Sequence, residues 1–144
     1  MTGEATLTTM VPRHRSTTDQ LLAQTVQLAT EVRGTLVAAP AGDRAGALRR
    51  LRQVAKIGEL TALLGYCVAW LLVRKAVETG ELTPEEGCSD ERRLGAMAPL
   101  PGIGPDLETA VGPDLADLDQ EVRALYARLA RLDRLLDEVG PERG

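Results

Sequence analysis

Aromatic residues are scarce in this sequence, which has no phenylalanine, one tryptophan (Trp70) and two tyrosines (Tyr66 and Tyr126). Strands favour aromatic and β-branched side chains, whereas the abundant alanine, leucine, arginine and glutamate favour helices. A β-sheet fold is therefore not expected. The chain of 144 residues is long enough for one all-α domain and too short for two domains of ordinary size.

Metal-binding and catalytic residue types are also few. His14 is the only histidine, and Cys67 and Cys88 have no partner at metal-ligand spacing. No nucleophile, base and orienting group can be assembled from this inventory, so we expect no enzyme activity, metal or cofactor. Because Cys67 lies in the most apolar segment and Cys88 in a polar turn, we expect free thiols in a cytoplasmic protein.

An excess of positive charge is missing as well. The formal net charge is −4 at pH 7, which argues against a general nucleic-acid binder because such binding rests on neutralising phosphates. Arg49, Arg52 and Lys56 nevertheless share one side of a predicted helix at steps of three and four. With Arg74 and Lys75 they form a candidate docking surface for an acidic protein, and a nucleic-acid patch is the alternative.

The sequence has no uncharged stretch of membrane-spanning length. The longest apolar run, residues 60–73, has fourteen uncharged residues between Glu59 and Arg74. A membrane span needs about 20, and a run of 10 to 14 is more typical of a buried core helix. We therefore expect a core helix and no membrane, with membrane association through residues 60–73 as the alternative.

Capping residues, prolines and glycines divide the chain into segments. Ser16 to Asp19 and Asp43 are typical helix starts, and Gly80 is typical of a left-handed helix end. One domain is expected over residues 17–139. Its expected elements are a disordered tail (1–16), helices over 17–39 and 43–79, a short helix over 84–94, a flexible Gly/Pro-rich connector (95–113), a third long helix over 114–139 and a C-terminal tail (140–144).

The third long helix has the most regular pattern, with apolar residues at alternating steps of three and four from Leu115 to Val139. The charged residues between them are expected to form a solvated face. The apolar set is Leu115, Leu118, Val122, Leu125, Leu129, Leu132, Leu136 and Val139. The charged set is Asp117, Asp119, Glu121, Arg123, Arg128, Arg131, Asp133, Arg134 and Asp137.

The segment 43–79 combines apolar residues on every side with a stripe of small ones. A helix that is apolar all round must be covered all round. We therefore predict an antiparallel three-helix bundle, up-down-up, that forms a homodimer to cover the excess apolar surface. The residues expected to pack in the core or the dimer seam are Ala55, Gly58, Ala62, Gly65, Ala69 and Trp70.

Two segments of the same region resemble a known family. Glu59-Leu60-Thr61 precedes a run from Ala69-Trp70-Leu71-Leu72 through Arg74-Lys75-Ala76-Val77 to Gly80-Glu81-Leu82-Thr83. This pattern resembles the alphaproteobacterial regulator of CtrA degradation (RcdA) family over about a sixth of the chain. Val68-Ala69-Trp70 departs from the family's Ala-Ser-Trp, and Leu82 replaces a methionine.

The resemblance implies a non-enzymatic adaptor in regulated proteolysis. Such an adaptor is a three-helix homodimer that tethers cell-cycle regulatory substrates to a ClpXP-type protease, together with a response-regulator-like protein. From the resemblance we expect these partners. From the net charge and the length of the apolar run we expect neither nucleic acid nor a membrane.

Overall fold

The computed structural model describes residues 16–35, 43–89, 92–94 and 110–139. Within these residues the secondary structure is all helical, so the expected all-α fold is confirmed. The helices are α2 (Thr17–Gly34), α3 (Arg44–Glu78), α4 (Pro84–Gly87) and α6 (Pro113–Val139). The expected disordered tails and the greater part of the connector 95–113 lie outside the described residues.

The helices begin where capping side chains were expected. The Ser16 hydroxyl accepts a hydrogen bond from the Asp19 amide at 3.1 Å, and an Asp43 carboxylate oxygen accepts one from the Gly46 amide at 2.7 Å. These bonds satisfy backbone N–H groups that have no partner inside the helix. The first helix ends at Gly34, earlier than the expected residue 39. Glycine has low helix propensity, which suits this end.

The end of α3 and the start of α4 form a tight corner. Gly80 has φ of 82°, and the amides of Gly80 and Glu81 donate to the carbonyls of Val77 and Ala76. These two hydrogen bonds together form a Schellman motif, in which glycine takes the left-handed position at no steric cost. Thr83 then opens α4 with a complete capping box. The short helix is confirmed but covers only Pro84–Gly87 of the expected 84–94.

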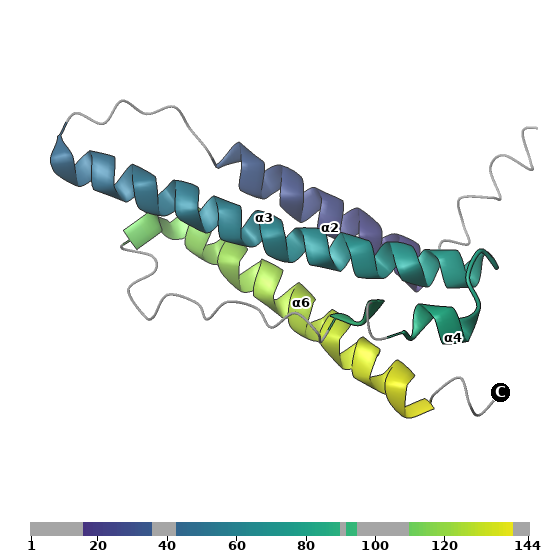
Figure 1. Ribbon diagram of the computed structural model, residues 1–144. Helices are drawn as coiled ribbons and strands as arrows, with labels where there is room; N and C mark the ends of the chain where they lie inside the picture. Colours follow the sequence, from purple (N-terminus) through teal and green to yellow (C-terminus); the bar gives the residue numbers. More distant parts are fainter. Residues whose placement is uncertain (1–15, 36–42, 90–91, 95–109, 140–144) are drawn as a thin grey trace, which may run out of the picture.

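The direction of the third long helix differs from the prediction. α2 and α3 are antiparallel, whereas α6 runs parallel to α3 (Figure 1). Two hydrogen bonds fix this direction. Lys56 donates to Asp119 and Trp70 donates to Asp133, and in both pairs the partners are 63 residues apart. A constant separation means that the two helices advance in the same direction. The expected up-down-up order is therefore wrong. The 34 residues between α3 and α6 are enough chain to return to the start of α3 before α6 begins.

The core lies where α2, α3 and α6 pack against one another. α3 contributes mainly residues from Leu60 to Leu71, and α6 contributes its expected leucines up to Leu129, with Leu132 and Leu136 half-buried. Two charged residues that were expected on the solvated face of α6 are buried instead. Asp119 is 5% exposed and Asp133 is 6% exposed. Each accepts a hydrogen bond from α3, which offsets the loss of water.

Candidate protein-interaction face

The side of α3 that faces away from the core is apolar and uncovered. Leu51 is 68% exposed and Leu72 is 54% exposed, although leucine is among the residue types most often buried. We call this surface the α3 outer face. Its exposed members are Leu48, Leu51, Val54, Ala55, Gly58, Ala62, Gly65, Ala69 and Leu72.

No charged side chain interrupts the middle of this face. Between Arg52 and Arg74 the only charged residues of α3 are Lys56 and Glu59, and both turn toward α6. An open groove of about 840 Å³ lies beside the face, between α3 and α2. Its lining includes Gly65 and the 57% exposed Val26. Contiguous apolar surface of this extent is typical of sites that bind another protein or a membrane.

The predicted core or seam residues divide between the two sides of α3. Trp70 is 5% exposed and belongs to the core. The small residues lie on the outer face instead, so they do not pack in the core of the chain. A Cβ atom added to Gly58 or Gly65 would meet nothing within 4 Å outside its own helix. The small residues are Ala55, Gly58, Ala62, Gly65 and Ala69.

Trp70 is held by one contact at the edge of its ring system and one contact over its face. Its indole N–H donates to an Asp133 carboxylate oxygen at 3.0 Å, and the Arg74 guanidinium lies 5.5 Å from its ring centre. The guanidinium also donates to the Gly87 carbonyl, which ties the corner after α3 to the helix. Trp70 and Arg74 thus stabilise the join between α3, α4 and α6.

A cluster of four charges, of which Lys56 and Asp119 are buried and Glu59 and Arg123 half-buried, joins α3 to α6. The Lys56 ammonium lies 3.1 Å from a Glu59 oxygen and 3.0 Å from an Asp119 oxygen, and its side chain is fully buried. Arg123 pairs with Asp119 at 3.0 Å and also with Glu59. Two positive and two negative groups balance, so no net charge is buried.

The expected docking cations do not form one surface. Arg49 and Arg52 are exposed near the start of α3, but Lys56 is 1% exposed, so its assignment to a docking surface is wrong. Lys75 pairs with Asp19 at 2.9 Å, and this ion pair lowers the pKa of Asp19. Arg74 and Lys75 lie more than twenty residues, or about 33 Å of helix, beyond Arg52.

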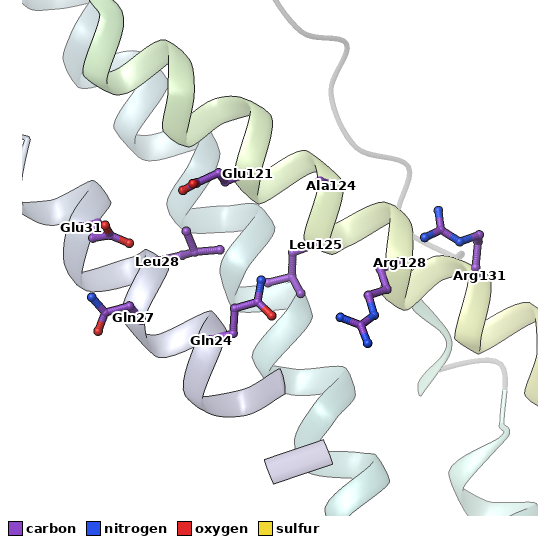
Figure 2. Close-up of a pocket in the computed structure, with 9 residues that line it drawn as sticks. All are labelled: Gln24, Gln27, Leu28, Glu31, Glu121, Ala124, Leu125, Arg128 and Arg131. Carbon is purple, nitrogen blue, oxygen red and sulfur yellow. The ribbon is translucent and has the colours of Figure 1, made fainter. Parts of the chain in front are cut away.

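A second groove, of about 540 Å³, lies between α2 and α6 (Figure 2). Leu28 and Leu125 point into it from the two helices, and Arg128 and Arg131 lie toward one end. The sequence pattern did not indicate this groove, because it depends on how α2 and α6 pack. Its lining residues are Gln24, Gln27, Leu28, Glu31, Glu121, Ala124, Leu125, Arg128 and Arg131.

Reactive groups are sparse in the described part of the chain, where no three His, Cys, Asp or Glu residues gather to hold a metal. His14 lies outside the described residues. Cys67 is completely buried, as expected, and its burial raises the pKa of its thiol to about 11. α3 is long and apolar enough to cross a membrane by length and composition, and 33% of its most apolar window is buried.

Comparisons with known proteins place the chain in a family. No curated protein and no solved structure matches the chain. The family described as "Protein of unknown function (DUF1465)" matches residues 12–143, which is nearly the whole chain. The protein therefore belongs to the DUF1465 family.

Proposed function

We propose that the protein is a non-enzymatic adaptor that binds other proteins, and that its role is in regulated proteolysis. The α3 outer face carries the part of this proposal that concerns protein binding, because a large uncharged surface on a charged helical scaffold is suited to binding another polypeptide, a second copy of the chain included. The resemblance to the RcdA family carries the second part. By that resemblance, the partners are a ClpXP-type protease, a response-regulator-like protein and cell-cycle regulatory substrates.

The residues that carry the resemblance have clear structural roles in this chain. Trp70 and Arg74 fix α3 to α6 and α4, Gly80 ends α3, and Thr83 caps α4. A shared pattern at these positions supports a shared scaffold. Partner choice must then come from exposed residues, because only exposed side chains can contact a partner.

The finer architecture is part of the proposal. The three long helices act as one three-helix bundle, which forms a cytoplasmic homodimer. Self-association covers apolar surface that α2 and α6 leave open on α3. The exposed Arg49 and Arg52 near the start of α3 remain available for an acidic partner.

Binding to a purified ClpXP-type protease tests the proposed role. The tagged protein is immobilised, and binding of the unfoldase is measured at physiological salt with and without a response-regulator-like protein. We expect binding that falls at least tenfold when Arg49 and Arg52 are both replaced by glutamate. Replacing the exposed Arg134 by glutamate on α6 is the matched control. If the protease does not bind, or both variants weaken binding equally, the proposed role or its docking surface is wrong.

A membrane-associated protein is the second candidate, and the apolar composition of α3 favours it. In this fold, however, α2 and α6 cover the other side of α3 and carry exposed charges such as Glu31, Arg33 and Arg128. Insertion of α3 would take those charges toward hydrocarbon at high cost. Flotation with lipid vesicles tests this candidate. A nucleic-acid role loses support, because Lys56 of its basic patch is buried in ion pairs.

A further inference from the structure

The exposed large apolar residues of the described chain gather on one side of the molecule. Leu48, Leu51, Val54 and Leu72 lie on the α3 outer face, and Val26 lines the groove beside it. Only Leu135, among the exposed large apolar residues, lies elsewhere, on α6. A single occupant can therefore cover all of these residues except Leu135.

We propose that a second copy of the chain covers this face, with the two α3 helices antiparallel and their twofold axis crossing the outer face at the level of residue 60, between Gly58 and Ala62. This inference rests on the proposed self-association and assigns its surface, direction and register. The central row of the face repeats at alternating steps of three and four. It consists of Leu48, Leu51, Ala55, Gly58, Ala62, Gly65, Ala69 and Leu72.

This row is self-complementary when the helix is reversed. With the axis at residue 60, Leu48 meets the partner's Leu72, and Leu51 meets the partner's Ala69. The small residues meet one another in the middle, as Gly58 does with the partner's Ala62. Every residue of the row thus meets another residue of the same row, as a twofold interface requires. The small central residues allow the two backbones to approach closely.

Charge favours the antiparallel direction over the parallel one. The start of α3 carries Arg44, Arg49, Arg50 and Arg52, whereas its last two turns combine Arg74 and Lys75 with Glu78 and the Asp19 that pairs with Lys75. A parallel pair would bring both basic ends together. The antiparallel pair places each basic end beside the nearly neutral end of the other copy, which lowers the repulsion.

The first turns of α3 are also the part that the chain itself leaves least covered. These turns extend beyond the end of α2 (Figure 1). The last residue of α2, Gly34, lines grooves together with Gln53 and Ile57, so α2 ends beside these residues and does not reach the turns before them. The antiparallel partner reaches these turns with the C-terminal half of its own α3. The row from Leu48 to Leu72 is about 36 Å long, so with the Val26 groove two copies bury on the order of 1,000 Å². This area is at the lower limit for a specific dimer, so we expect dissociation on dilution.

Cysteine crosslinking tests both the surface and the direction. In a Cys88→Ser background, Leu48→Cys and Leu72→Cys are made in two separately tagged chains and oxidised alone or mixed. In the antiparallel dimer, two copies of residue 48 lie about 36 Å apart, so neither variant can crosslink to itself. We expect a crosslinked pair only in the mixture. Self-crosslinking of either variant alone overturns the direction, and no crosslink in the mixture overturns the register.

Analytical ultracentrifugation of two further variants tests the surface without any crosslink. Gly58→Leu fits the isolated chain, because nothing lies within 4 Å of its added Cβ, but it blocks the approach of a second helix. The control, Ala127→Leu, adds the same side chain at an exposed position of α6. We expect unchanged helicity in both variants and a dimer dissociation constant at least tenfold higher for Gly58→Leu alone.

Three results overturn the proposal: a wild-type chain that is monomeric at high concentration, equal dimerisation of both variants, or wild-type chain that floats with lipid vesicles instead of dimerising. Protease binding is measured separately on the wild-type chain. If the wild-type chain forms no dimer but binds the protease, the proposed dimer is wrong and the adaptor role survives. If the dimer forms but no protease binds, only the adaptor role is wrong.

Discussion

At the scale of single residues, Lys56 has the largest fully buried side chain of the described residues. It is fully buried between Glu59 and Asp119, and Arg123 completes a balanced set of charges. Lys56→Met keeps much of the volume but leaves one uncompensated negative charge in the core. We expect it to lower the free energy of unfolding by about 3 kcal/mol, measured by urea denaturation.

The double variant Lys56→Met with Asp119→Asn is the control for this interpretation. It restores electrical balance, because Glu59 and Arg123 still pair with each other. It should therefore recover at least half of the lost stability. A double variant as unstable as the single one would show that packing of the lysine chain, and not charge balance, dominates at this site.

The two cysteines differ in their surroundings, which leads to a second residue-scale prediction. Burial raises the pKa of the Cys67 thiol to about 11, so this thiol stays protonated between pH 7 and 9. Only the thiolate reacts with disulfide reagents. We expect Cys67 to remain unlabelled in the native protein across this pH range while the half-buried Cys88 reacts. Both should react in urea, and equal native rates would contradict the burial of Cys67.

At the scale of elements, the exposed glycines of α3 reduce the stability of an otherwise regular helix. No atom outside its own helix lies within 4 Å of a Cβ atom added at Gly65, so Gly65→Ala causes no steric clash within the chain. It should raise the free energy of unfolding by about 0.5 to 1 kcal/mol, because alanine has less backbone entropy to lose. Thermal unfolding at a fixed chain concentration measures the change.

Gly80→Ala, just beyond the C-terminal end of the same helix, is the matched control. Its φ of 82° lies in the left-handed region, where a Cβ atom is strained. The substitution should therefore destabilise the protein by about 1 kcal/mol, although open space surrounds this glycine too. Opposite signs at the two positions would show that backbone conformation, and not available space, decides the outcome.

Local sequence patterns predicted the positions of the helices well and the contacts between the helices poorly. Capping residues and periodicity located α2, α3 and α6, since these signals act within one or two helical turns. The burial of Asp119 and Asp133 was missed because the period of α6 alone placed them among solvated charges. Their bonds to Lys56 and Trp70 span 63 residues, and no local pattern reports such a distant partner.

At the scale of the whole molecule, the sequence pattern also left the direction of α6 unspecified. A leucine repeat with steps of three and four packs against a neighbour in either direction. The buried polar bonds break this symmetry, because Lys56 meets Asp119 and Trp70 meets Asp133 only when α6 is parallel to α3. A reversed α6 would leave these polar groups buried without partners, so they specify the fold as well as stabilising it.

The parallel direction of α3 and α6 can be tested by measuring the distances between pairs of spin labels, one on each helix. Arg49 and Asp114 both line a third groove, of about 760 Å³, at the start of α3 and α6. Arg134 lies 20 residues further along α6 than Asp114. Labels are attached to cysteines at 49 and 114, or at 49 and 134, in a Cys88→Ser background diluted with unlabelled chain. The label at 134 lies about 30 Å further along the axis of α6 than the label at 114, from the rise of 1.5 Å per residue, so the second distance should be clearly the longer one. An up-down-up arrangement would reverse the order of the two distances, because an antiparallel α6 brings its C-terminal end to the start of α3.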